Sequence, residues 1–316
     1  MNGIKKFGSI CKLNQEELKR YLTGQLLSSG YAPITGKGFV YAKGNIPVLV
    51  TAHMDTVHKE TVKRYSIHNF KKKHLIKSQQ GIGGDDRCGC YMILEIIKEM
   101  KPYVLFCEDE EIGGVGSDLF CQTSFVDDVA DNVNYMIELD RANEKDAVFY
   151  DCDNPEFTNF IIEHTGYKEA YGTFSDISNL MPETGIAGVN LSCGYYNAHT
   201  LKEYVLFEEM ENTINVVKEL LKVESERFIY IESKKYFPSL YGRYYNNYSY
   251  YDKYDSCYPS YGYPKNEGYL EVTYYDTDKT ECTKCAYGET EEEAFGNFFI
   301  ENGNVCYNDV IDYWFV

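Results

Sequence analysis

The stretch VLVTAHMDTVH, residues 48–58, decides how the chain is expected to fold. It opens with Val48, Leu49 and Val50, three apolar residues in a row that do not alternate with polar ones. A run of this kind is typical of a strand that is buried on both faces, as in a parallel sheet. The stretch continues into a histidine and an aspartate two residues apart, His53 and Asp55. These two residues either cap the strand or bind a ligand.

Segments with similar signals surround this strand. Apolar runs predict further strands at 103–106, 135–139 and 186–194, and short strands fill the region up to residue 79. Helical spacing of apolar residues, or a capping residue, predicts helices over 14–30, 88–100, 154–166 and 203–223. Strands that alternate with helices predict an α/β fold, with a mostly parallel central sheet flanked by helices, over residues 1–225.

The pattern changes after residue 225. Residues 226–265 are rich in tyrosine and poor in aliphatic residues, so we expect a linker or a surface segment there. Residues 266–316 contain the strand-like YLEVTYYD and the helix-like ETEEEAFGNFFIE, which predict a small C-terminal α+β domain of unknown role. Cys282 and Cys285 in that domain form a C-x-x-C pair, which leaves a structural metal site and plain reduced thiols both open.

The composition excludes several kinds of partner. A formal net charge of −18 repels phosphate backbones and anionic lipid, so we expect neither a nucleic acid nor a membrane as partner. The sequence has no run of about 18 apolar residues and no apolar signal-peptide segment in residues 1–13. Its 11 cysteines, an odd number scattered through expected core segments, predict reduced thiols and hence a cytoplasmic protein.

Residue types that bind metal ions lie just after the predicted strands, or just before a predicted helix. They are His53, Asp55, Asp85, Asp86, Glu108 to Glu111, Asp140 and His199. Because the carboxyl ends of parallel strands meet at one edge of a sheet, we expect these side chains to lie close together. So many carboxylates would repel one another unless cations lay among them. Histidine with carboxylate suits zinc, and also manganese or cobalt, so the sequence predicts a pair of divalent ions.

Five short motifs then resemble, in order and type, those of the co-catalytic metallopeptidases. The motifs are HMDT, GGDDRCG, DEEIGGVGS, ELD and NAHT. The M20, M28 and M42 families of one zinc-peptidase clan share this set. The resemblance covers roughly residues 45–210 and implies the zinc-peptidase fold of the clan, which is phosphorylase/hydrolase-like. Five motifs in the right order are a specific signal, whereas a His-x-Asp at a strand end is not.

The resemblance implies five ligands for two divalent ions, with zinc as the first candidate. The ligands are His53, Asp85, Glu111, Asp140 and His199. His53 and Asp140 would hold one ion, Glu111 and His199 would hold the other, and Asp85 would bridge the two.

Other residues receive roles from the same resemblance. Glu110 would be the general base, and Asp55 would orient His53. The peptide bond after Asp85 would be cis, and Asp176 in GTFSDISNL would help to shape the site. The remaining histidines lie in no motif, and we expect them to be ordinary surface or core residues. They are His58, His68, His74 and His164.

The spacing of the motifs narrows the choice of family. His53 and Asp85 are only 32 residues apart, which leaves no room for the domain that M42 enzymes insert there. Asp140 and His199 are 59 residues apart, too few for the dimerisation lid of M20 enzymes. The catalytic unit is therefore compact, as in M28 enzymes, although its motifs HMDT and DEEIG are more similar to those of M20 or M42 enzymes.

The resemblance implies a di-zinc aminopeptidase that cleaves N-terminal residues from small peptides, by a metal-bound hydroxide with Glu110 as base. Two alternatives stay open. One is an M20-type amidohydrolase of N-acyl amino acids or dipeptides, and the other is a non-catalytic metal-binding homologue. The expected partner is a small peptide or amide, and homo-oligomer formation also stays open.

Overall fold

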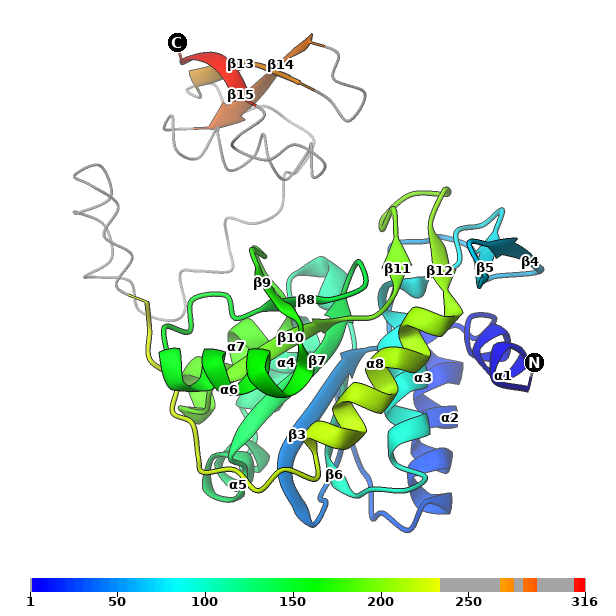
Figure 1. Ribbon diagram of the computed structural model, residues 1–316, viewed down its shortest axis with the longest axis vertical. Coiled ribbons are helices and arrows are strands. Elements are labelled where there is room, and N and C mark those ends of the chain that lie inside the picture. The colour runs from blue at the N-terminus through cyan, green and yellow to red at the C-terminus, as the bar shows by residue number, and fades with distance from the viewer. Residues whose placement is uncertain (1, 234–267, 276–280, 289–309, 316) are drawn as a thin grey trace. The chain divides into compact units, whose positions relative to one another are not determined.

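Strand β3 (Ile46–His53) lies inside an eight-stranded sheet in the computed structural model of the protein (Figure 1). Both of its neighbours, β6 (Pro102–Cys107) and β7 (Tyr135–Arg141), run parallel to it. Every side chain from Val48 to His53 is buried, which confirms the prediction of a strand covered on both faces. The strand order is β1-β2-β6-β3-β7-β10-β8-β9, and the four strands from β6 to β10 in this order are mutually parallel.

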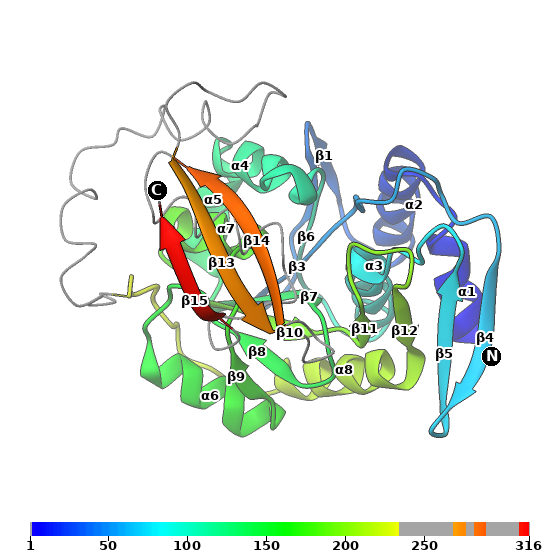
Figure 2. The same cartoon turned by 90° about the horizontal axis from the view of Figure 1, so that it is seen from above.

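The structure describes residues 2–233, 268–275, 281–288 and 310–315. The other strands of the large sheet are β1 (Ile34–Gly36), β2 (Phe39–Ala42), β8 (Asp146–Val148), β9 (Lys168–Ala170) and β10 (Gly188–Ser192). A smaller antiparallel sheet has the order β11-β12-β5-β4. Its strands are β4 (Tyr65–Phe70), β5 (Lys73–Ser78), β11 (Tyr195–Tyr196) and β12 (Tyr204–Leu206). This sheet lies beside helix α1 (Asn2–Ile10) in both views (Figures 1 and 2).

Helices cover both faces of the large sheet, which confirms the predicted fold class (Figures 1 and 2). One face carries α3 (Gly84–Ile96), against which α1, α2 (Gln15–Ser28) and α8 (Phe207–Leu220) pack. The other face carries α4 (Val115–Cys121), α5 (Phe125–Asn132) and α7 (Asp176–Thr184). Helix α6 (Pro155–Thr165) contacts α8. Among the described residues, no helix is long and apolar enough to cross a lipid bilayer.

Most of the predicted elements are present, with one clear error. Helix α2 begins with a capping box, in which Asn14 accepts the N–H of Glu17, and α6 begins after the cap Asn154. The predicted helix over 203–223 is wrong at its start, because Tyr204–Leu206 form β12 and pair with β5. Helices α1, α4, α5 and α7 were not predicted from the sequence.

Residues 226–233 belong to the first of the two units into which the chain divides, Met1–Lys235 and Tyr236–Val316. The N–H of Phe228 donates to the carbonyl of Asn134 at 2.8 Å, and the N–H of Tyr230 donates to the carbonyl of Gly185 at 2.9 Å. The ring of Phe228 packs on Tyr135. The domain boundary at residue 225 stays a prediction, and these contacts lead us to propose that the first domain continues to about residue 233.

The second unit contains one antiparallel sheet in the order β14-β13-β15. Its strands are β13 (Gly268–Tyr275), β14 (Glu281–Gly288) and β15 (Val310–Phe315). The first of these is the predicted strand YLEVTYYD. The predicted helix over 289–301 and the tyrosine-rich residues 234–265 lie outside the described residues. Cys282 and Cys285 both lie in β14.

Candidate metal centre

The candidate site lies where three neighbouring parallel strands end. His53 is the last residue of β3, and in the sheet register it stands beside Cys107, the last residue of β6. A short turn after β6 leads to Glu110 and Glu111, which begin a 3₁₀ helix (Glu110–Ile112). On the other side of β3, strand β7 carries Asp140 near its end. Parallel pairing therefore brings three motifs, from well-separated parts of the sequence, to one edge of the sheet.

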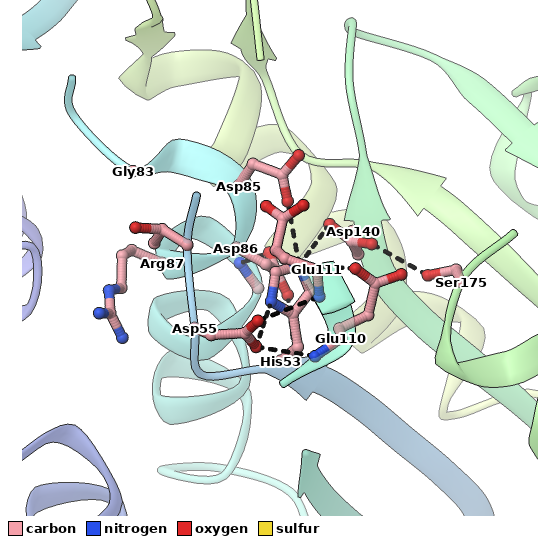
Figure 3. Close-up of polar contacts among 12 residues, drawn as sticks. His53, Asp55, Gly83, Asp85, Asp86, Arg87, Glu110, Glu111, Asp140 and Ser175 are labelled. Atoms are coloured by element: carbon pink, nitrogen blue, oxygen red, sulfur yellow. Dashed lines mark hydrogen bonds and ion pairs between the residues drawn. The ribbon is translucent and has the colours of Figure 1, made fainter. Parts of the chain in front are cut away.

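The five predicted ligands form two groups of three that share Asp85. Within each group, one ligand atom from each residue lies within 4.8 Å of the others. The first group is His53, Asp85 and Asp140, and the second is Asp85, Glu111 and His199. One oxygen of Asp85, Oδ1, lies 3.0 Å from Nε2 of His53 (Figure 3). The other, Oδ2, lies 3.2 Å from Nε2 of His199. Asp85 thus faces both groups with different oxygens.

The donor set fits divalent ions. Each group combines one imidazole nitrogen with two carboxylates, a combination that zinc, manganese and cobalt accept. Buried polar atoms in proteins are normally hydrogen-bonded, but Oε1 of Glu111 is buried with no hydrogen-bond partner. An orphaned carboxylate oxygen beside a histidine and a second carboxylate is what a metal ligand leaves when no ion is present.

The pKa values in the centre report an excess of negative charge. Burial raises the pKa of Glu110 to about 10 and that of Asp140 to about 7, and nearby carboxylates add to both shifts. Hydrogen bonds to Asp85 and Glu111 raise the pKa of His199 to about 11. Burial lowers the pKa of His53, but Asp140 and its other acidic neighbours outweigh this and raise that pKa well above the ordinary value. The raised pKa values mean that the acids and histidines of the centre hold on to protons. These protons offset the negative charge, as bound divalent ions would.

Metal binding is therefore expected to release protons at pH 7. Both histidines bind protons there because their pKa values are raised, whereas a ligating imidazole must be neutral. Protons and metal thus compete, and the affinity for metal should rise with pH. The check is calorimetric titration of Zn²⁺ into the metal-free protein in two buffers with different ionisation enthalpies. Equal heats in both buffers would contradict the expectation. The control is His68→Ala, at an exposed histidine, which should leave the number of protons released on metal binding unchanged.

Asp55 links His53 to the turn that carries the two glutamates. Its Oδ1 lies 3.2 Å from Nδ1 of His53, and its two oxygens accept the N–H groups of Glu110 and Glu111, each at 3.0 Å (Figure 3). Burial raises the pKa of Asp55, but the contacts with His53 and with these two amides outweigh burial and lower it. An ionised Asp55 at Nδ1 leaves Nε2 of His53 free to bind a metal ion.

Asp140 is oriented by residues that the sequence analysis did not select. Ser175 donates its hydroxyl to Oδ2 of Asp140 at 2.9 Å, and Tyr195 donates to Oδ1 at 3.3 Å. The side chain of Asn190 accepts the N–H of Asp140 at 2.9 Å. Ser175 precedes the predicted Asp176, which is fully buried at the first turn of α7. No spacing signal identifies these three residues, because each reaches Asp140 across at least 35 positions of the chain.

Glu110 and Asp86 are acidic residues near the two ligand groups, and their surroundings differ. Oε2 of Glu110 lies 3.9 Å from Nε2 of His53, close to the first ligand group but outside it. Asp86 follows Asp85 across a cis peptide bond, as the resemblance implies. Asp86 is fully buried, and it accepts the N–H groups of His53 and Gly89. Asp86 therefore holds the local backbone rather than facing the ligand groups.

The family model of Peptidase family M28 matches residues 40–179. Over this segment the chain resembles the M28 metallopeptidases. The match includes His53, Asp85, Glu111 and Asp140, and His199 lies beyond it. It confirms the predicted resemblance to the co-catalytic metallopeptidases and the predicted enzyme class. No curated protein matches the chain.

Solved structures share the fold of the metallopeptidase domain at low sequence identity. Aminopeptidase PepT from Bacillus cereus is 14% identical, with a TM-score of 0.57 over 69% of this chain and 97% of that chain. A tripeptidase from Staphylococcus aureus is 12% identical, with a TM-score of 0.55 over 70% and 97%. The TET1 peptidase from Pyrococcus horikoshii is 12% identical, with a TM-score of 0.52 over 70% and 98%. At these identities the comparison supports the fold alone.

Proposed function

We propose that the chain is an aminopeptidase that removes N-terminal residues from small peptides with the help of two divalent ions. Zinc is the first candidate for both ions, with manganese and cobalt as alternatives. The observation that carries the proposal is the pair of ligand groups that share Asp85, with Glu110 directly beside them. His53 and Asp140 would hold one ion, and Glu111 and His199 the other.

When bound, such ions would lower the pKa of a water molecule and polarise a carbonyl group. The chain supplies the proton transfers. A carboxylate oxygen of Glu110 accepts the proton of the attacking water and returns it to the nitrogen of the leaving amine. Asp55 keeps His53 in the tautomer that presents Nε2, and Ser175 with Tyr195 holds the carboxylate of Asp140.

The charge of the centre favours a free amino terminus on the substrate. Five carboxylates lie in it or touch it: Asp55, Asp85, Glu110, Glu111 and Asp140. When ionised, they carry one negative charge more than two divalent ions neutralise. A protonated α-amine next to the scissile bond would be attracted by the remaining charge. Two solved structures with this fold are those of an aminopeptidase and a tripeptidase, which agrees with this preference.

The compact layout counts against the amidohydrolase alternative. All the described strands and helices between Asp140 and His199 belong to the metallopeptidase domain, and β8, β9 and β10 lie in its large sheet. No separate lid domain interrupts this part of the chain. The lid of M20 enzymes usually helps to bind the substrate, so its absence favours a substrate held mainly at the metal centre.

Substrates with a free amino terminus are therefore expected to be cleaved faster than their N-acetylated forms. The measurement is kcat/KM for aminoacyl amides, di- and tripeptides, and the same compounds after N-acetylation. Each N-acetylated compound is the matched control for its free form, because only the charge and size of the amino terminus change. Faster cleavage of the acetylated forms would assign the enzyme to the amidohydrolase alternative. No cleavage of any compound by the metal-loaded protein would favour the non-catalytic homologue.

Two wider expectations also stay proposals. The TET1 structure is described as a peptidase that can assemble into a tetrahedron or a large octahedral shell, which supports testing this chain for homo-oligomers. The seven cysteines whose side chains the structure describes form no disulfide. This agrees with reduced thiols and supports the proposed cytoplasmic location.

A further inference from the structure

Glu203 is a fully buried carboxylate outside the two ligand groups. Its Oε1 accepts the N–H of Asp85 at 3.0 Å, and its Oε2 accepts the N–H of Gly83 at 2.8 Å. The same Oε2 lies 2.8 Å from Nε2 of His58, whose side chain is also buried. A buried carboxylate is costly unless hydrogen bonds or opposite charge compensate for it. Here both oxygens are used, and two of the three partners are backbone amides beside the shared ligand.

The backbone around Asp85 needs this acceptor. Gly83 precedes α3 in a left-handed conformation, with φ of +64°, and provides no side-chain cap. Asp85 and Asp86 have φ and ψ values outside the helical range, so the first turn of α3 is not a regular helix. The first amides of a helix have no partner within the helix itself. Glu203 satisfies two such amides from 118 and 120 residues away.

The network connects three segments that each carry metal ligands. His58 follows His53 and Asp55 in the loop after β3. Glu203 lies four residues after His199, and its own N–H donates to the carbonyl of Thr200 at 3.1 Å. The third segment is the turn that contains Asp85. Gly81, just before this turn, leaves space for the imidazole of His58, because a Cβ atom on Gly81 would lie 2.2 Å from that ring.

We propose that Glu203, held by His58, is a positioning residue that fixes the backbone of Asp85 and so keeps both ligand groups assembled. Holding the N–H of Asp85 fixes the direction of its Cα–Cβ bond. Its carboxylate then presents one oxygen to His53 and the other to His199. This inference rests on the proposed function, because it needs two ions. Its consequence is specific, because displacing a shared ligand weakens both ion sites together.

The test is Glu203→Gln in the full-length protein. Glutamine keeps the size of the side chain but replaces one acceptor oxygen by an NH₂ group, which cannot accept an N–H donor. The affinity of each of the two ion sites should fall by about 10- to 100-fold, the usual effect of losing a group that supports a metal ligand. Both affinities are measured by titrating the metal-free protein, first with Zn²⁺ and, in a separate experiment, with Mn²⁺. Glu203→Asp, which keeps the charge, should recover part of the affinity for both ions.

Two comparison variants make the result specific. Glu111→Gln changes a ligand of the second group only, so it should weaken one binding step and leave the other near wild type. Glu208→Gln is the matched control, because Glu208 forms another carboxylate–imidazole pair, with His74, outside the ligand groups. It should leave both affinities unchanged.

The outcomes separate this inference from the proposed function. Weakening of both ions in Glu203→Gln supports the positioning role. A lower melting temperature with both affinities unchanged, or weakening of one ion only, overturns it and leaves the proposed function intact. If Glu203→Gln does not fold, Glu203→Asp and His58→Gln are titrated instead, and unchanged affinities in both overturn the inference. If the wild-type protein binds neither ion, the proposed function and this inference both fail.

Discussion

Replacing Glu110 with glutamine is expected to lower kcat by about 10²- to 10⁴-fold while both metal ions stay bound. Glutamine matches the shape of glutamate but cannot accept the proton of the attacking water. Glu110 lies outside both ligand groups, so the substitution should leave the metal sites in place. The measurements are kcat on the best substrate with a free amino terminus and the metal content of the purified protein.

The adjacent Glu111→Gln provides the comparison. Glu111 lies 3.0 Å from Nε2 of His199 and belongs to the second ligand group, so this variant should lose affinity for one ion. The two residues differ by one position at the start of a short 3₁₀ helix, and their side chains therefore point in different directions. Near-wild-type activity in Glu110→Gln, or loss of metal from Glu110→Gln but not from Glu111→Gln, would contradict the assigned roles.

Removal of the metal ions is expected to abolish the activity, because they stabilise the developing charge of the transition state by several kcal/mol. The purified protein should contain two divalent ions per chain, measured by elemental analysis after gentle purification with added metal. A chelator should remove both ions and the activity, and added Zn²⁺, Mn²⁺ or Co²⁺ should restore activity.

Asp85→Asn tests the same point without a chelator. It removes the charge of the one residue that belongs to both groups, so it should reduce binding of both ions and lower kcat/KM by at least about 10²-fold. Asp128→Asn is the control, because Asp128 pairs with Lys43 and Tyr41 away from the ligand groups. Only trace metal in active protein, or full activity after chelation, would refute a metal-dependent reaction.

The site residues that could be predicted from the sequence each lie in a short stretch with a recognisable pattern. His53 lies at the end of an unalternating apolar run, and Asp85 lies in a glycine-rich turn before a helix. The order of the motifs along the chain then supports each one. The buried parallel strands were predictable for the same reason, because burial on both faces removes the polar residues from a strand.

The residues that were missed act through long-range contacts. Glu203 contacts Asp85 across 118 positions, and His58 contacts Glu203 across 145, so neither has a local pattern. Their residue types are common on protein surfaces, so His58 was predicted to be an ordinary histidine. The start of the predicted helix over 203–223 was wrong because the apolar run YVLF is compatible with a strand as well as with a helix. Its pairing with β5 decides the outcome, and that is a tertiary contact.

The ligands come from positions between 53 and 199, and the strand ends, helix start and loops that carry them come together only in the folded domain. The unfolded chain therefore has no preformed place for two ions, and metal supply enters the folding equilibrium itself. A ligand that binds only the folded state adds about 4 kcal/mol of stability for each site at a free concentration of about 1,000 times Kd. A shortage of metal in the surroundings would then lower the resistance of the domain to heat and proteases, as well as its activity.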